Sequence, residues 1–367
     1  VVLGDVVITA LGIKRETKAL TYNVQEIKAE ELTSVKDANF VNSLAGKIAG
    51  VQINSSASGI GGSSRVVMRG TKSLFGENNA LYVIDGVPIL NTKQEQPDSF
   101  YESPDGGDSD PVSFLNTDDV ESISVLTGAA AAALYGSQGA NGVILITTKK
   151  GEAGKLRVSY SNSTQFMKPF VMPEFQDRYG SKDNGLNSWG TLGTAKPYSP
   201  KDFFQTSFTE MNSLSASVGT ETNQTYISLG AMQARGLIPK NSLNRINVNI
   251  RNSTDLIKNK LSLDLTLSYV NHKDINMMTQ GQYHNPLLPL YLFPRGDDME
   301  KYKVYERYNA ERNFKTQFWP YENQGLGMQN PYWVANKEQF KNKTDRYSLT
   351  AALKYDVLDW LNITGRV

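Results

Sequence analysis

The chain has 367 residues, enough for two or three domains with a buried core. Its 38 lysines and arginines balance 37 acidic residues, so the net charge of +1 offers no basic field for nucleic acid or anionic lipid. Cysteine is absent and histidine occurs only twice, which excludes a disulfide framework and cysteinyl metal sites and leaves little for zinc or imidazole catalysis.

Hydropathy excludes one class of membrane protein and leaves another open. No stretch approaches the roughly 18 consecutive apolar residues that a membrane-spanning helix needs, and no basic-then-apolar signal peptide opens the sequence. The mean hydropathy of -0.40 is compatible with a membrane β-barrel, because only every second residue of such a strand faces lipid. Periodicity must therefore decide between the classes.

Residues 1 to 153 are predicted to form a compact α/β domain of short elements. We expect one helix from Asp37 to Ile48, capped by Asp37, and a second from Ala129 to Tyr135, where helix propensity is high. A loop from about residue 90 to 117, rich in Pro, Gly, Asp and Ser, is expected at the surface. Short strands are expected at Val51–Ile53, Arg65–Met68, Leu81–Ile84, Ile123–Leu126 and Val143–Thr147.

Two motifs in this domain were candidates for ligand binding. The run SGIGGSS, from Ser58 to Ser64, is glycine-rich, but it lacks the Gly-Lys-Ser/Thr ending of a phosphate loop and precedes a strand, which favours a flexible loop. Asp105, Asp108 and Asp110 are weak candidates for calcium ligands, because the spacing and terminal glutamate of an EF-hand are missing. No nucleophile, base and orienting acid can be assembled, so we predict no enzyme and no cofactor.

Two arginines border the predicted strand of Val66 to Met68. Arg65 and Arg69 fall on one face of it, and Gly70 follows. Two interpretations stay open: a solvated strand edge, or structural ion pairs between this domain and the wall of a surrounding barrel.

From about residue 155 the sequence changes to segments of roughly ten residues in which apolar and small polar side chains alternate. In the strongest, Leu261 to Tyr269, leucines and the tyrosine share one face, and Ser262, Asp264, Thr266 and Ser268 share the other. Between Arg346 and Tyr355 the apolar face has a tyrosine at each end, as in the aromatic girdles of membrane barrels. Five further strands are expected near residues 156–160, 214–218, 227–231, 246–250 and 360–367.

The connections between these seven strands alternate in length. Segments 219–223, 252–258 and 356–359 are short, 234–241 is of modest length, and 168–210 and 271–343 are long. Short turns on one side and long loops on the other are typical of bacterial outer-membrane barrels, and a soluble sandwich would not explain a loop of about seventy residues. His272 and His284 fall in this long loop without the HExxH spacing, so we expect them to be solvated.

Four runs in the first domain resemble a known family. SLAGKIAGVQI (43–53), SSRVVMRGT (63–71), LYVIDGVPI (81–89) and DDVESISVLTGAAAAALYGSQGANGVILITTKKG (118–151) are similar to the plug of SusC/RagA-like TonB-linked outer-membrane transporters. The likeness covers residues 5 to about 160 strongly and the later strands only through their pattern. Thr127 and Gln138 depart from the family, where lysine and arginine are usual, so no charged contact is carried over at those positions.

The resemblance implies an α+β plug domain inside a transmembrane antiparallel β-barrel of about 22 strands. The domains are then a TonB-box segment at 1–12, a plug at 13–153 and the N-terminal part of the barrel at 154–367. Within the plug, Asp85 and Gly86 of the run LYVIDGVPI, with Arg65 and Arg69, are expected to be structural. Seven strands are about a third of such a barrel, and an open sheet would leave unpaired edges in lipid, so we expect the chain to be part of a longer protein.

The resemblance also implies the partners. The protein would reside in the outer membrane of a Gram-negative bacterium, Bacteroidetes-like by the family, where a SusD-like lipoprotein closes over the loops and TonB pulls on the N-terminus. The run DVVIT, comprising Asp5, Val6, Val7, Ile8 and Thr9, matches the place and character of the TonB box. An extended β-branched peptide can add a strand to a sheet edge in TonB. The alternative is that this run is only the first strand of the plug.

The cargo stays open between oligosaccharide and oligopeptide. Parity of the strands places the loop from about 271 to 343 outside the cell, and its aromatic residues suit stacking on sugars or packing against a peptide or the lipoprotein. Trp319, Trp333, Tyr291 and Tyr321 are the candidate contacts, although these rings could instead fold the loop on itself. Rival functions are a secreted or surface β-rich adhesin and, more weakly, an enzyme with a polar cleft.

Overall fold

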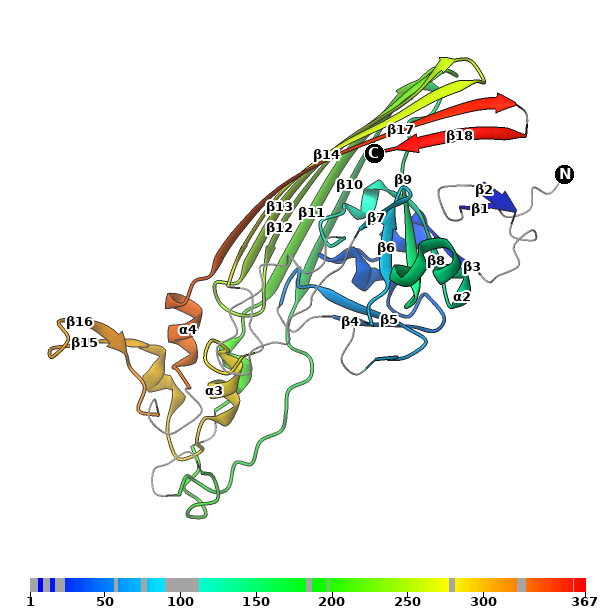
Figure 1. Cartoon of the computed structure of the whole chain (residues 1–367). Helices are drawn as coiled ribbons and strands as arrows, with labels where there is room; N and C mark the ends of the chain where they lie inside the picture. Colours follow the sequence, from blue (N-terminus) through cyan, green and yellow to red (C-terminus); the bar gives the residue numbers. More distant parts are fainter. Residues whose placement is uncertain are drawn as a thin grey trace.

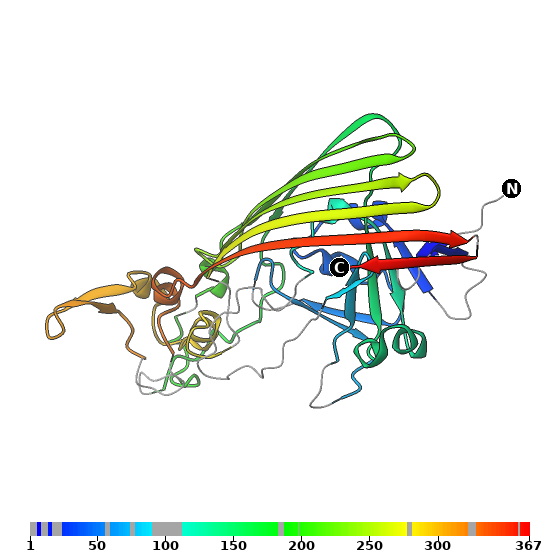
Figure 2. The same ribbon diagram turned by 45° about the horizontal axis from the view of Figure 1, so that its top comes forward.

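A computed structural model describes residues 6–8, 14–16, 24–55, 59–73, 78–89, 112–182, 187–196, 198–276, 281–321, 328–358 and 360–367. A compact N-terminal domain lies against one side of a long, curved sheet (Figure 1). Figure 2 gives the same arrangement from a second direction.

The N-terminal domain is built on a mixed sheet of five strands in the order β3-β8-β9-β6-β7. The β6 and β9 strands run parallel, and the other neighbours are antiparallel. Apolar residues cover both faces of this sheet: Ile123, Ile144 and Tyr82 lie in one core cluster and Leu126 and Val143 in another. The strands are β3 (Val24–Lys28), β6 (Leu81–Ile84), β7 (Val87–Ile89), β8 (Val120–Leu126) and β9 (Val143–Thr148).

Short elements surround this sheet. The predicted helix from Ala129 to Tyr135 is confirmed as α2. The helix expected from Asp37 to Ile48 is wrong in type and extent, because only the 3-10 helix η3 (Phe40–Leu44) forms, and the Asn39 side chain, not Asp37, caps it by accepting from the Val41 N–H. The remaining elements are β1 (Val6–Ile8), β2 (Lys14–Glu16), α1 (Ala29–Thr33), β4 (Val51–Ser55), β5 (Ser64–Met68), η4 (Thr117–Asp119) and η5 (Gly136–Gly139).

The long sheet contains the seven predicted strands as antiparallel neighbours in the order β10-β11-β12-β13-β14-β17-β18. The short turns lie at one end of these strands and the long connections at the other, which we call the turn end and the loop end. The strands are β10 (Gly154–Met167), β11 (Ser207–Gly219), β12 (Asn223–Arg235), β13 (Ser242–Ile257), β14 (Leu261–Ile275), β17 (Lys341–Leu358) and β18 (Leu361–Arg366).

The two faces of the long sheet differ as the alternation predicts. Leu265 and Leu267 of β14 are 37% and 48% exposed on the outer face. Val270 of β14 and Leu243 of β13, which pairs with Asp274, point to the other side and are buried on the inner face that the N-terminal domain contacts. The outer face is thus apolar and uncovered, whereas the inner face is occupied by protein.

The long connections fold into a small unit of their own at the loop end (Figure 1). Its apolar core includes Phe203, Leu290, Phe293 and Trp319, so both long connections contribute to it. No helix in the described ranges is long and apolar enough to cross a membrane. The unit contains η6 (Pro200–Phe203), α3 (Leu287–Leu292), η7 (Met299–Lys303), β15 (Glu306–Asn309), β16 (Phe314–Gln317) and α4 (Pro331–Lys337).

Candidate functional site

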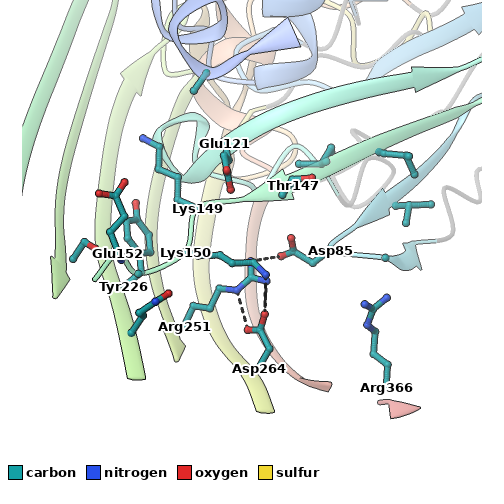
Figure 3. Close-up of a pocket in the computed structure, with 18 of the residues that line it drawn as sticks. Asp85, Glu121, Thr147, Lys149, Lys150, Glu152, Tyr226, Arg251, Asp264 and Arg366 are labelled. Atoms are coloured by element: carbon teal, nitrogen blue, oxygen red, sulfur yellow. Dashed lines mark hydrogen bonds and ion pairs between the residues drawn. The ribbon is translucent and has the colours of Figure 1, made fainter. Parts of the chain in front are cut away.

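A charged contact joins the N-terminal domain to the inner face of the long sheet. The Arg251 guanidinium of β13 binds Asp264 of β14 through two bonds, with Nη2 2.8 Å from Oδ2 and Nε 3.0 Å from Oδ1. Its Nη1 lies 3.2 Å from Oδ2 of Asp85 and donates to the Thr148 hydroxyl at 2.7 Å. Figure 3 shows Arg251 between the two carboxylates. One buried arginine therefore ties β13 and β14 of the sheet to β9 and to the turn between β6 and β7 of the domain.

Local backbone geometry positions Asp85 for this contact. Asp85 and Gly86 connect β6 to β7 and have φ values of 48° and 83°, the pair of positive angles that a type I′ hairpin turn requires. The Asp85 carboxylate accepts from the Thr148 N–H at 3.0 Å and from its hydroxyl at 2.6 Å. A Cβ on Gly86 would lie 1.9 Å from an Arg366 guanidinium nitrogen, so this position excludes a larger side chain unless Arg366 moves. The predicted structural role of Asp85 and Gly86 fits this geometry.

A cavity of ≈ 520 Å³ lies around this contact, between the domain and the sheet. Its walls are rich in charged side chains of both signs (Figure 3). No cluster of three or more His, Asp or Glu residues able to hold a metal ion occurs in the described ranges. The charged lining residues are Glu30, Asp85, Glu121, Lys149, Lys150, Glu152, Arg157, Arg251, Asp264 and Arg366.

The segment just before β8 makes a second set of polar contacts with the sheet. Arg245 of β13, which is buried, donates to the Ser113 carbonyl, and Asn247 donates to the Phe114 carbonyl. The Tyr226 hydroxyl of β12 donates to the Asp119 carboxylate at 3.0 Å. The part of the loop from 112 to 117 is therefore docked in the interior, contrary to its expected place at the surface.

Burial changes the chemistry of Asp119. Its side chain is 3% exposed, and this desolvation raises the pKa of the carboxyl from 3.8 to about 6, although the Ser228 and Tyr226 hydroxyls partly offset the shift. A second buried charge is better compensated, because Lys36 Nζ bonds the Asp118 carboxylate at 2.6 Å and the Ser161 hydroxyl of β10 at 2.6 Å. The contact between domain and sheet thus relies on several buried polar groups.

The sequence of the N-terminal domain is similar to a known protein family. Residues 16–143 match the model of the TonB-dependent Receptor Plug Domain. Residues 16–143 are a plug domain. TonB-dependent receptor SusC of Bacteroides thetaiotaomicron is 28% identical over 90% of the chain, and TonB-dependent receptor P3 of Formosa agariphila is 24% identical over 98% of it. The chain is SusC/RagA-like and spans about a third of the length of these two relatives.

Solved structures share the fold. The structure of the RagAB peptide transporter matches 95% of the chain with a TM-score of 0.71 at 18% identity, and the chain covers 41% of it. The ferric enterobactin receptor of Pseudomonas aeruginosa, as its R480A mutant with enterobactin bound, matches 95% with a TM-score of 0.51. The long sheet therefore has the fold of part of a β-barrel wall, and the plug contacts its inner face.

The predicted TonB box is only partly described. Asp5 and Thr9 lie outside the described residues. Val6, Val7 and Ile8 form β1, which pairs with β2 alone and joins neither the plug sheet nor the wall in the described part. Because a two-stranded ribbon has marginal stability by itself, this backbone is suited to exchange one partner strand for another. Its binding to TonB stays a prediction.

Arg65, within β5, and Arg69, just after it, were left open between a solvated strand edge and ion pairs with the wall. Arg65 and Arg69 are both exposed, and within the described ranges neither forms an ion pair. This exposure is what the solvated interpretation expects, and β5 pairs with β4 in a separate two-stranded hairpin. An ion pair between plug and wall is present, but its arginine, Arg251, belongs to the wall and its carboxylate, Asp85, belongs to the plug.

The glycine-rich run contacts the wall where a phosphate loop would need open space. Gly61 has φ of 74°, and a Cβ there would lie 2.3 Å from Cδ2 of Leu243 on β13. Ile60 packs on the same small apolar cluster as Leu243 and Met232. The run therefore lets plug backbone approach the wall closely. The candidate calcium ligands Asp105, Asp108 and Asp110 lie outside the described residues.

The aromatic residues of the long loop mostly face one another. Trp319 and Tyr321 are buried in the core of the loop unit, and the Tyr302 and Tyr321 hydroxyls both donate to the Asp297 carboxylate. As contacts for cargo or a lipoprotein, Trp319 and Tyr321 are thus poorly placed, because packing against other rings removes them from solvent. Tyr291 and Trp333 are half-buried, so part of each ring stays accessible.

Both histidines are packed, contrary to the expectation of solvated side chains. His272 lies inside β14, 2% exposed, with Nε2 3.4 Å from the Asp274 carboxylate and its ring edge-on to Phe114 of the plug. His284 Nδ1 lies 2.7 Å from the Glu338 carboxylate. β14 extends to Ile275, beyond the end of the predicted apolar pattern at Tyr269. The pattern did not show this extension because the inner face of the strand becomes polar where it contacts the plug.

Arg245 and Arg251 are functional residues that were not predicted from the sequence. The sequence did contain a signal for them. Both arginines alternate with the apolar residues Ile246, Val248 and Ile250 of the same strand, so they face the opposite side of the sheet. A basic residue on the inward face of a wall strand must find a partner inside the barrel, since an unpaired buried charge is costly.

Proposed function

We propose that the chain supplies the plug and first wall strands of a transporter that imports oligosaccharide or oligopeptide across the outer membrane, driven by TonB. The observation that carries this proposal is the polar contact between plug and wall, formed by Arg251, Asp85 and Asp264 on the inner face of a sheet whose outer face is apolar. An apolar outer face suits lipid, and a filled interior suits a gated pathway.

The chemistry of the contact supports a plug that can move. Arg245 and Asn247 bond backbone carbonyls of the plug, and Arg251 bonds carboxylates, so water can replace each bond when the surfaces separate. The shared apolar cluster is small, with Ala38 and Ile60 from the plug side. Polar interfaces between domains are the ones expected to permit relative motion. Pulling on the N-terminal segment would then open a path along the wall.

The N-terminal ribbon is the proposed attachment for TonB. Val6 to Ile8 is β-branched and already extended, and its register with Glu16 to Lys14 involves only three residue pairs. Strand addition uses main-chain hydrogen bonds, which do not demand particular side chains. TonB would thus replace the weakly held β2 as the partner of β1.

A SusD-like lipoprotein is the proposed lid over the loop unit. The support is the likeness to SusC and to RagAB, together with a loop unit folded around its own aromatic core. Neither oligosaccharide nor oligopeptide is favoured by the described residues. Tyr291 and Trp333 remain the candidate contacts, because their rings are partly accessible.

Deleting residues 1–11 from the full-length protein tests the mechanism. We expect normal folding and outer-membrane insertion but loss of uptake, because the lumen stays filled when nothing pulls on the plug. A matched control deletes Trp189 to Thr194 in an external loop, which should leave the response to TonB unchanged. Normal uptake by the shortened protein would place the TonB contact elsewhere.

A surface adhesin without transport is the second candidate. It shares the plug and the loop unit but needs no movement of the plug. Locking the plug to the wall with a disulfide, through cysteines at Asn116 and Gly230, separates the two functions, because a Cβ at Gly230 would lie 3.2 Å from Cγ of Asn116. Binding at the surface would survive the lock, whereas import would stop until reductant is added.

A further inference from the structure

The loop end of the wall carries a group of basic residues on its outer, lipid-facing side. Arg235, Lys273, Lys341 and Lys343, from β12, β14 and β17, are exposed and have the parity of the outward residues Leu229, Leu267 and Leu349 of their own strands. We call these four residues the outer basic patch. The overall charge of +1 gave no reason to expect it, because the patch is local.

Two of these lysines oppose each other directly. In the register of β14 and β17, Lys273 pairs with Lys343, and Lys341 pairs with Ile275 two residues further along the same face. Opposed side chains in an antiparallel pair have Cβ atoms about 4.5 to 5.5 Å apart, and like charges there destabilise the sheet. The strand pair therefore carries a repulsion that the ion pair of Lys343 with Asp345 offsets in part and that a bound anion would reduce further.

The nearest acid does not neutralise the patch. Asp345 accepts from Lys343 at 2.8 Å, from the Asn271 amide at 2.6 Å and from the Tyr269 hydroxyl at 2.8 Å. Across the described ranges, the side chains of Lys273, Lys341 and Arg235 have no ion pair. The patch thus holds four cations against the one carboxylate of Asp345, so it keeps an excess of positive charge that includes the opposed pair Lys273 and Lys343.

The outer basic patch lies at the level of the lipid headgroups. Tyr269 and Tyr347 stack with ring centroids 4.8 Å apart and end the apolar face of β14 and β17. Lys273 lies four residues beyond Tyr269, roughly 13 Å along the strand and roughly 10 Å along the membrane normal at the usual barrel tilt. Aromatic girdles mark the boundary of the hydrocarbon, so the amines lie among the headgroups of the outer leaflet.

The neighbouring side chains suit a ligand that carries hydroxyl groups as well as an anionic group. Asn244 lies opposite Lys273, and Gln233 lies opposite Asn244, so a row of exposed amides continues across β13 and β12. Amides bind hydroxyl groups as donors and acceptors, and ammonium groups bind phosphate as point charges. Below them, Leu267 and Leu349 present exposed apolar surface for acyl chains.

We propose that the outer basic patch binds the phosphorylated sugar headgroup of an acylated glycolipid in the outer leaflet. The phosphate lies between Lys273 and Lys343, the sugar contacts Asn244, and the acyl chains cover the leucines beneath. This site goes beyond import, because it lies on the lipid side of the wall and needs neither plug movement nor TonB.

Binding of diphosphoryl lipid A to the full-length protein in detergent tests the proposal. For the K273Q/K343Q variant we expect about 30-fold weaker binding, from about 1 kcal/mol for each lysine near a charged headgroup and 1.4 kcal/mol for each factor of ten. Lys258→Gln is the matched control, because Lys258 is exposed in a turn at the opposite end of the wall. That variant should bind as wild type does.

Three comparisons make the result decisive. Equal affinity of wild type and K273Q/K343Q overturns the site. Equal affinity of wild type for lipid A whose phosphates have been removed overturns the role of phosphate, and equal affinity for phosphatidylglycerol overturns the role of the sugar. Lys341→Gln lies outside the opposed pair and should weaken binding about fivefold, so the proposal stays testable if the double variant fails to assemble.

Discussion

Arg251→Gln should loosen the plug from the wall without preventing assembly of the barrel. The substitution removes the charge that lies between Asp85 and Asp264 and leaves two carboxylates facing each other at the interface. Glutamine keeps part of the volume and can replace at most one of the bonds that the guanidinium makes. The perturbation is therefore mainly electrostatic.

The structure sets the size of the effect. Breaking a buried ion pair from one side costs about 3 to 5 kcal/mol, and the Arg251 side chain is 5% exposed. Both acids keep another partner, because Thr148 bonds Asp85 and Lys150 lies 3.3 Å from Asp264. Asp264 is also 24% exposed, which reduces the penalty further. We therefore expect about 2 to 3 kcal/mol.

Pulse proteolysis of the full-length protein in increasing urea measures this loss. At a typical urea dependence of about 1.5 to 2 kcal/mol per molar, the midpoint for plug cleavage should fall by about 1.5 M, while the barrel stays intact. Arg157→Gln is the control, because Arg157 pairs with Glu152 in the same wall but both side chains are mostly exposed. Its midpoint should move by less than about 0.5 M. Equal shifts in the two variants would refute the assignment of Arg251 as the main ionic tie.

Three further outcomes are expected. Leu265→Lys should impair assembly far more than Thr266→Lys, by about 2 to 4 kcal/mol, because only residue 265 faces lipid; equal heat-modifiability of the two would contradict the register. Asp119→Asn should flatten the pH dependence of plug stability. The wild-type carboxyl has a folded pKa of about 6 against an ordinary 3.8, so up to about 3 kcal/mol present at low pH is lost as pH rises toward and through 6; an unchanged urea-midpoint profile between pH 4 and 7 would count against this. Trp319→Ala should expose the loop unit to protease at a cost of about 3 to 5 kcal/mol, and half-buried Trp333→Ala should cost less; the reverse order would show that the core is misassigned.

The sequence by itself determined those helices and strands whose residue patterns are the most regular. The seven wall strands, their two faces and the helix from Ala129 to Tyr135 were all predicted, because period-two alternation and helix propensity are local properties of the chain. The helix expected over residues 37–48 was the main local error. Its apolar stripe, including Val41 and Leu44, is buried as expected, but in a shorter 3-10 helix.

Only the tertiary structure decided which side chains meet. Asp85 and Arg251 lie in different domains, and nothing in either local sequence names the other, so their ion pair follows from where the plug docks on the wall. The same holds for Trp319, whose ring can serve a ligand or a core until the loop folds around it. Local pattern fixes the face on which a residue lies, whereas burial and pairing depend on contacts between segments distant in the chain.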